Sequence, residues 1–129
     1  MARTITKSKM IFHIANRSDW MATQERGSYR VPSLESEGFI HCSSEDQVLA
    51  VANAFYPGQS GLVLLVIDVQ LLQSEIKWEA PAESAVHPIP ASNKFPHVYG
   101  PINLEAVVQT LDFEPDANGR FSLTLPHEG

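Results

Sequence analysis

The stretch LVLLVIDV, residues 62–69, decides the fold of this chain, and its first six residues form the longest uninterrupted apolar run. A continuous aliphatic segment of this length predicts a strand at the centre of a sheet, with both faces covered. It is far shorter than the ~20 residues that a membrane-spanning helix needs. The rest of the fold is therefore expected to assemble around this strand.

Further strands are predicted on both sides of this core strand. The run MIFHIA, residues 10–15, is apolar apart from His13 and predicts a buried strand. Segments 38–42 (GFIHC), 76–80 (IKWEA) and 107–113 also have strand character. The ANG sequence at 117–119 predicts a hairpin turn into a last strand at 121–125.

Two short helices are predicted between the strands. The first begins at Ser18, in SDWMATQERG, and ends at Gly27. The second begins at Ser44, which forms a capping-box pattern with Gln47. Apolar residues recur at helical spacing from 48 to 55, until the Pro-Gly pair at 57–58 ends the helix.

Loops are predicted at 29–37, which contains Pro32 and no clear period, and in the proline-rich segment after residue 80. The order of elements predicts an α+β fold with a mixed, mainly antiparallel sheet, two short helices and a C-terminal hairpin. We expect one domain over residues 1–129, with a basic frayed tail at 1–9 and the hairpin and tail at 114–129.

Charge and cysteine content narrow the function. The 129 residues carry a net charge of −6, but residues 1–30 carry +4 and residues 31–129 carry −10. An acidic body repels phosphate backbones, so extended nucleic acid is an unlikely partner and a small anionic or nucleotide ligand is expected. The single Cys42 excludes an internal disulfide and suits the cytoplasm. No segment predicts a membrane partner, and the oligomeric state is left open.

The segment EGFIHCSS, residues 37–44, carries the most chemical information. If a strand leads into a helix at Ser44, the unpaired N–H groups of the first helical turn and the hydroxyls of Ser43 and Ser44 would favour a phosphate or carboxylate. The alternative is that Ser44 only caps the helix.

Histidines on two predicted strands suggest a shared site. His13 and His41 would face one ligand if their strands are neighbours, by donating hydrogen bonds or by general acid–base work. The alternative for His13 is a hydrogen-bonded core residue. Three histidines, His13, His41 and His97, could hold a metal, but no pair has the spacing of a zinc signature, so no metal is expected. Cys42 should point away from His41 into the core.

The third cluster is FPHVYGP, residues 95–101. A stiff loop with His97 and Tyr99 between prolines could clamp a planar ring, and the alternative is a turn whose aromatic rings cover the sheet edge. Trp78 is expected in the core. Glu79, next to it, could orient a ribose hydroxyl or a histidine.

Taken in order, IFHIA, SLESEGFIHCSS, LVLLVID, KWE and FPHVYGPINLEAVV resemble the bacterial domain-of-unknown-function family 952 over residues 10–113. The resemblance implies a fold like that of the ADP-ribosyltransferase superfamily, closest to RNA 2′-phosphotransferases. In that branch, histidines on the first two core strands contact NAD, and these positions correspond to His13 and His41. The late-strand catalytic glutamate of other branches has no certain counterpart here.

These observations predict a nucleotide-binding enzyme of the transferase type that uses NAD or an ADP-ribose-like nucleotide. The alternative is a non-catalytic binding module on the same fold. The predicted catalytic residues are His13, His41 and His97. The predicted ligand-binding residues are Arg30, Ser33, Glu37, Ser43, Ser44, Trp78, Glu79 and Tyr99.

Overall fold

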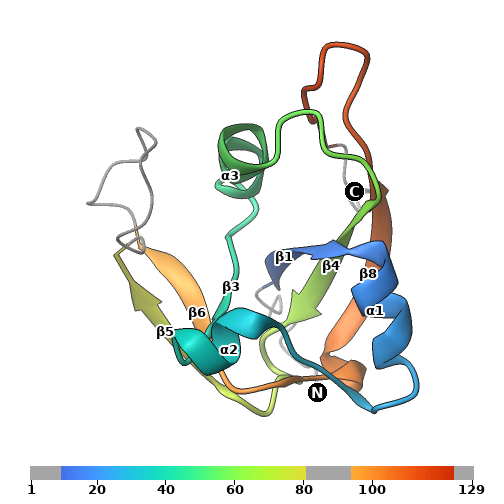
Figure 1. Ribbon diagram of the computed structural model, residues 1–129. Helices are drawn as coiled ribbons and strands as arrows, with labels where there is room; N and C mark the ends of the chain where they lie inside the picture. Colours follow the sequence, from blue (N-terminus) through green and yellow to red (C-terminus); the bar gives the residue numbers. More distant parts are fainter. Residues whose placement is uncertain (1–9, 81–93, 124–129) are drawn as a thin grey trace, which may run out of the picture.

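The computed structural model describes residues 10–80 and 94–123 (Figure 1). The elements follow in the order β1 (Met10–Asn16), α1 (Arg17–Thr23), β2 (Ser28–Tyr29), α2 (Pro32–Ser36), β3 (Ile40–His41), α3 (Val48–Phe55), β4 (Leu62–Asp68), β5 (Glu75–Glu79), β6 (Phe95–Tyr99), β7 (Ile102–Asn103), the 3-10 helix η1 (Leu104–Ala106) and β8 (Val107–Phe113). The predictions for segments 1–9, 81–93 and 124–129 lie outside the described residues.

The strands form three antiparallel sheets, which confirms an α+β fold with mainly antiparallel pairing. The first sheet has the order β1-β4-β8, the second β3-β6-β5, and β2 pairs with β7. The predicted core strand β4 is central in the first sheet. The first two sheets meet where Phe12 and Ser43 exchange two backbone hydrogen bonds of 2.7 and 2.8 Å. This bridge places β1 beside the end of β3.

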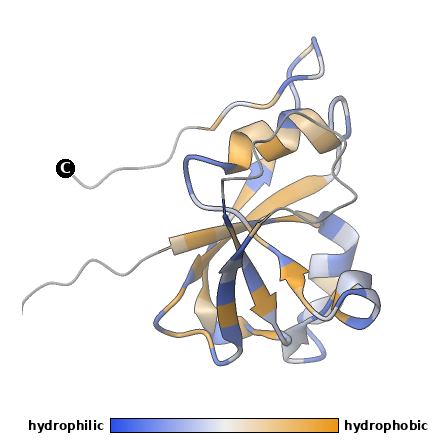
Figure 2. Cartoon of the chain, turned by 90° about the vertical axis from the view of Figure 1, so that its left-hand side faces the viewer, coloured by the Kyte–Doolittle hydropathy of each residue, from blue (hydrophilic) through white to orange (hydrophobic). Residues whose placement is uncertain are grey.

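Strand β4 is buried on both faces, as its continuous apolar sequence predicts. Val63, Leu65 and Ile67 pack in one core, which also holds buried residues of β1, β3, β6 and β7. The alternate residues Leu62 and Leu64 pack in a second core, together with α3 and the C-terminal segment. Figure 2 shows the largely apolar α3 over one side of the strands.

The helices differ from the prediction in their limits and in their number. The first predicted helix is α1, but it begins at Arg17 and ends at Thr23, so the expected limits at Ser18 and Gly27 are wrong. Its N-cap is Asn16, whose side chain accepts from the N–H groups of Ser18 and Asp19. The predicted loop at 29–37 instead contains strand β2 and helix α2, because Pro32 occupies a first-turn position that needs no N–H donor. That position explains why the proline does not prevent the helix.

The second predicted helix begins at Val48, so the expected start at Ser44 is wrong. Residues 44–47 form a turn in which the N–H groups of Gln47 and Val48 both donate to the Ser44 carbonyl at 3.1 Å. The Gln47 side chain accepts from the Ser44 N–H at 2.9 Å, which is half of the predicted capping box. The capping pattern of Ser44 and Gln47 therefore belongs to a turn that precedes the helix.

The expected stiff loop at 95–99 is strand β6, the middle strand of its sheet. Proline in a central strand removes a donor, which is why the sequence favoured a loop. Pro96 keeps a ladder bond all the same, because its carbonyl accepts from the Cys42 N–H at 3.1 Å. His97 and Val98 then pair with strands on both sides.

The C-terminal hairpin is only half formed within the described residues. Its turn is present, since the Gly119 N–H donates to the Asp116 carbonyl at 2.9 Å. No strand is formed between residues 114 and 123. The Phe121 N–H instead donates to the Asn53 side chain of α3 at 2.8 Å, and the Phe121 ring stacks on Phe113. The contacts of Phe121 with the side chains of Asn53 and Phe113 thus take the place of the expected strand pairing. Among the described residues, no helix has both the length and the apolar character that crossing a membrane requires.

Candidate active-site cleft

A cleft of about 520 Å³ lies where β1, β3 and β6 meet α1, α2 and α3. Among its lining residues are all three predicted catalytic histidines, His13, His41 and His97. They come from three different strands, brought together by the β3–β6 pairing and by the bridge between β1 and Ser43. Apolar and aromatic side chains form much of the remaining wall, including Phe12, Val51, Tyr56 and Phe95.

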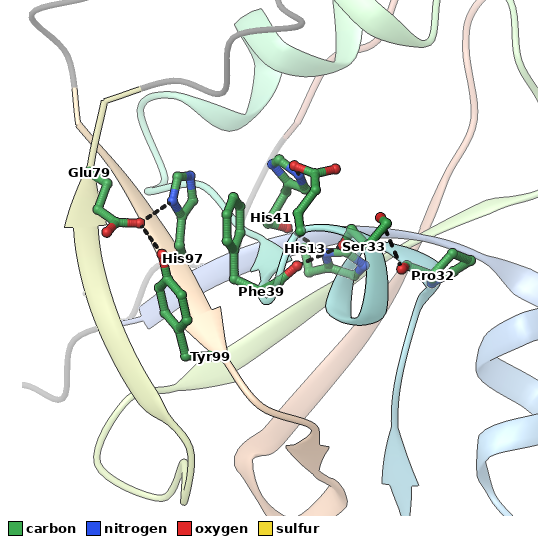
Figure 3. Close-up of polar contacts among 10 residues, drawn as sticks. His13, Pro32, Ser33, Phe39, His41, Glu79, His97 and Tyr99 are labelled. Carbon is green, nitrogen blue, oxygen red and sulfur yellow. Dashed lines mark hydrogen bonds and ion pairs between the residues drawn. The ribbon is translucent and has the colours of Figure 1, made fainter.

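His97 is held by a carboxylate behind it. Its Nδ1 lies 2.7 Å from Oε1 of Glu79, and the Tyr99 hydroxyl donates to the same oxygen at 2.6 Å (Figure 3). The strand register explains this contact. Glu79 pairs with Phe95 and His97 pairs with Lys77, so Glu79 and His97 are diagonal neighbours on one face of the sheet. The prediction that Glu79 could orient a histidine agrees with this geometry.

The Glu79 carboxylate is stabilised in its ionised form. The hydrogen bond from Tyr99, followed by that from His97, lowers the pKa of Glu79. In return, the bond to Glu79 raises the pKa of Tyr99. An ionised carboxylate only accepts hydrogen bonds, so Nδ1 of His97 carries the proton. Nε2 of the neutral ring is then the unprotonated nitrogen.

His41 and Phe39 stand next to His97. The His41 ring is 5.6 Å from the His97 ring, centroid to centroid, and nearly perpendicular to it. Its Nε2 lies 3.1 Å from the carboxylate of Glu37, and its side chain is 43% exposed. Phe39 stacks on His97 at 4.0 Å and contacts His41 edge-on at 4.8 Å. Figure 3 shows the Phe39 ring between the two imidazoles.

His13 has both ring nitrogens bonded inside the protein. Its Nδ1–H donates to the His41 carbonyl at 2.6 Å, and its Nε2 accepts from the Tyr29 hydroxyl at 2.9 Å. Burial lowers the pKa of His13 to about 4, so the ring is neutral at physiological pH. These contacts are those of the hydrogen-bonded core histidine that the sequence offered as an alternative. They fix β1 against β3 at the edge of the cleft.

The two serines after β3 differ from the expected anion site. Ser43 lines the cleft, but its N–H donates to the Phe12 carbonyl. The Ser44 N–H and hydroxyl are bound to Gln47 and Asp46, at 2.9 and 2.6 Å. With the helix beginning four residues later, these donors do not form the predicted phosphate pocket. The alternative, a capping role for Ser44, applies to the turn at residues 44–47 and not to the helix itself.

The other predicted ligand-binding residues divide into three groups. Ser33 lines the cleft, with its hydroxyl bound to the Phe39 carbonyl at 2.7 Å. Three residues support the histidines from outside the lining. Glu37 bonds His41, and Glu79, which accepts from Tyr99, bonds His97. Arg30, Ser44 and Trp78 lie outside the lining altogether, and Trp78 is 38% exposed, so its expected place in the core is wrong. Its position on β5, an edge strand of the small sheet, explains the exposure.

Tyr29 and Phe39 are site residues that the sequence analysis missed. Phe39 could have been found from strand alternation, since residues 39 and 41 lie on one face of a strand. Tyr29 had no such signal, because its partner His13 is 16 residues away and β2 is only two residues long. Cys42 lies buried in the core, as expected, and burial raises the pKa of its thiol.

Two absences within the described residues limit the chemistry. Residues 10–80 and 94–123 contain no group of three or more His, Cys, Asp or Glu side chains placed to hold a metal ion. In the same ranges, no lysine or arginine lines the cleft, whereas Asp19 does.

The fold and the sequence together define the class to which this chain belongs. It is a member of the family described as "Protein of unknown function (DUF952)", whose model matches residues 14–110. This confirms the resemblance drawn from the motifs, and residues 10–13 and 111–113 lie outside the matched range.

The chain is similar to protein CC0527 from Caulobacter crescentus. The crystal structure of that protein shares 30% identity and a TM-score of 0.73, covering 88% of this chain and 93% of the other. A crystal structure of its double mutant gives 29% identity, a TM-score of 0.72 and the same coverage. Its solution NMR structure gives 30% identity and a TM-score of 0.70, covering 86% of this chain and 90% of the other. Among curated proteins, none matches the chain.

Proposed function

We propose that the protein is a small transferase-type enzyme that binds NAD or an ADP-ribose-like nucleotide in the histidine-lined cleft. The observation that carries the proposal is the convergence of His41 and His97, from paired strands, on one cleft. At about 520 Å³ the cleft lies within the range of small-molecule sites. Its aromatic wall offers flat faces for a base or nicotinamide ring.

The division of labour between the histidines follows from their contacts. His41 and His97 each have one nitrogen next to a carboxylate, so their rings are oriented toward a ligand. His13 uses both nitrogens internally and supports the site through the His41 backbone. The resemblance to the ADP-ribosyltransferase-like fold supports nucleotide binding at the His13 and His41 positions, although His13 would act indirectly here.

The proposal extends to the setting of the protein. The free thiol of Cys42 fits a reducing compartment, and we place the protein in the cytoplasm. The acidic body disfavours extended nucleic acid and leaves a small nucleotide as the partner.

A calorimetric titration with NAD and with ADP-ribose tests the proposal. We expect saturable binding to the wild-type protein below millimolar concentration and at least tenfold weaker binding to His41→Ala. Lys77→Ala is a control in the same sheet, because Lys77 is on the edge strand β5, on the far side of β6 from His41, and does not line the cleft. The absence of binding at millimolar nucleotide, or equal affinity in the His41→Ala protein, would contradict the proposal.

A second candidate function is a non-catalytic module that binds a small molecule in the same cleft. The lack of a lysine or arginine among the described lining residues favours it, since a pyrophosphate has no cationic partner there. Incubation with NAD separates the two candidates. Release of nicotinamide supports the enzyme, whereas stabilisation of the fold by a nucleotide that is never consumed supports the module.

A further inference from the structure

The carboxylate behind His97 points to a defined chemical role at this site. We infer that His97 is the general base of the cleft, and that Glu79, bound by Tyr99, is the positioning residue that holds its Nε2 ready to accept a proton. The inference rests on the proposed function for the identity of the hydroxyl from which the proton comes. The tautomer and orientation of His97 are independent of any ligand.

The first step of the argument concerns which nitrogen is available. The Glu79 carboxylate accepts a hydrogen bond from the Nδ1–H of His97 at 2.7 Å, so Nε2 is the ring nitrogen with the free lone pair. No hydrogen-bond partner of Nε2 exists among residues 10–80 and 94–123, and every buried polar side-chain atom there has a partner. Nε2 is therefore accessible, and His97 contributes to the cleft lining. An accessible, unprotonated imidazole nitrogen is what a general base requires.

The second step concerns how firmly the ring is held. Phe39 stacks on one face of the imidazole at 4.0 Å and 13°, and only 4% of the His97 side chain is exposed. The Tyr99 hydroxyl bonds the same Glu79 oxygen, which restricts the carboxylate as well. The Glu79 carboxylate behind the fixed His97 ring also stabilises the imidazolium that forms when Nε2 accepts a proton. Position and charge thus both favour proton acceptance.

The reaction that this base would support needs no separate general acid to protonate the leaving group. The proton of an acceptor alcohol or water moves to Nε2 of His97 while the acceptor oxygen forms a bond to C1′ of the NAD ribose. The C1′–N bond to nicotinamide breaks, and its electron pair neutralises the pyridinium nitrogen, so that neutral nicotinamide leaves. One proton acceptor is sufficient, and His97 can be that acceptor, because its Nδ1 is held by Glu79 and its Nε2 has no partner among the described residues.

Imidazole nitrogen NMR on the full chain tests the positioning directly, without a ligand. In long-range proton–nitrogen spectra at about pH 8, where histidines are neutral, we expect wild-type His97 as the Nδ1–H tautomer alone. Glu79→Ala removes the acceptor and should shift His97 toward the Nε2–H tautomer. Glu79→Gln keeps a carbonyl acceptor and should retain Nδ1–H. A wild-type His97 protonated at Nε2, or an unchanged tautomer in Glu79→Ala, overturns the inference.

The other carboxylate–histidine pair provides a matched control. Glu37→Ala removes the partner of His41, so it should change the His41 signals and leave those of His97 as in the wild type. A His97 tautomer that responds equally to loss of Glu37 and of Glu79 would indicate a general disturbance and would contradict the specific pairing.

Nicotinamide release provides the chemical readout. General bases contribute about 10²- to 10⁴-fold to rates, so we expect His97→Gln to lower turnover by about 10² or more, with NAD affinity changed less than about threefold. Glu79→Gln should fall between wild type and Glu79→Ala. Unchanged turnover in His97→Gln overturns the inference. A wild-type protein with the expected tautomer but no NAD binding contradicts the proposed function and upholds the positioning by Glu79.

Discussion

His13 shows at the scale of one residue how burial sets a charge state. Its ring lies between the His41 carbonyl and the Tyr29 hydroxyl, and burial lowers its pKa from the ordinary 6.5 to about 4. The folded chain therefore resists protonation at a pH where the unfolded chain accepts it. This difference links the stability of the site to pH.

We expect the free energy of unfolding to fall as the pH falls from about 6.5 to about 4. In this window the unfolded state binds a proton at His13 that the folded state does not, so acid favours unfolding. The total loss from His13 should be about 3 kcal/mol. Urea denaturation at a series of pH values measures it.

His13→Gln is the comparison that isolates this effect. Its side chain does not titrate, so its stability should depend less on pH between 6.5 and 4. The carboxylates titrate alike in both proteins and cancel in the difference. Parallel pH profiles for the two proteins would show that His13 is not protonated on unfolding.

Tyr29 gives a second prediction at the residue scale. Tyr29→Phe removes the donor to Nε2 of His13 and leaves a buried acceptor unsatisfied, which should cost about 1–3 kcal/mol of stability. Chemical denaturation measures this loss. Tyr56→Phe, at a half-buried residue of the same cleft, should stay within about 0.5 kcal/mol. Equal losses in the two variants would argue against the His13 bond.

At the scale of elements, the strands show what could be predicted from the sequence. The central position of β4 follows from its continuous apolar sequence, because both of its faces are buried. The limits of β8 follow from its strand-forming residues, although only Phe113 of this strand is buried. Strand alternation also makes Glu79 and His97 diagonal neighbours on one face of the sheet once β5 and β6 are known to pair. The pairing of β5 with β6 joins residues that are far apart in the sequence, so no local pattern predicts it. Strand β6 was not predicted because local rules count the missing N–H of Pro96 and cannot count the hydrogen bond that its carbonyl accepts from Cys42.

The site was predictable in part for the same reason. His13 and His41 were found because a polar residue interrupts an apolar strand, which is a local signal. His97 was found through the aromatic and proline-rich cluster at residues 95–101, which was predicted as a loop and is strand β6 from Phe95 to Tyr99. The bond from the Ser43 N–H to Phe12 belongs to the bridge between β1 and the end of β3, which no local pattern encodes. The Ser44 N–H and hydroxyl are bound within the turn that precedes α3, by Gln47 and Asp46. The expected anion site at the first turn of a helix is therefore not formed, because the helix begins at Val48.

The turn between β6 and β7 provides a prediction at this scale. Gly100 has φ +151°, and a Cβ built there would lie 2.4 Å from Oγ of Ser74, whose hydroxyl donates to the Pro101 carbonyl. Gly100→Ala must displace Ser74 and should cost about 1–3 kcal/mol. In thermal unfolding, Gly27→Ala should cost less, since its positive φ is the only penalty and no atom lies nearby. A smaller loss at Gly100 than at Gly27 would contradict the packing argument.

At the scale of the whole molecule, residues 10–30, the described part of the basic N-terminal segment, place no lysine or arginine in the cleft lining. Arg17 pairs with Asp112 and Glu114, at 3.0 and 3.5 Å, and Arg30 lies outside the lining. If a nucleotide binds there, hydrogen bonds and ring contacts must supply most of the affinity. We expect the NAD dissociation constant to change less than about threefold between low and physiological salt. A steep salt dependence would instead indicate a cationic site elsewhere.

The most direct test of the central claim, that the histidine cleft is a ligand site, is an NAD titration followed by the imidazole NMR signals of the intact protein. The account predicts that the signals of His41 and His97 shift together and saturably, while His13 keeps its neutral tautomer with both nitrogens bonded. Histidine signals that stay unchanged up to millimolar NAD, or saturable shifts confined to residues outside the cleft, would contradict it.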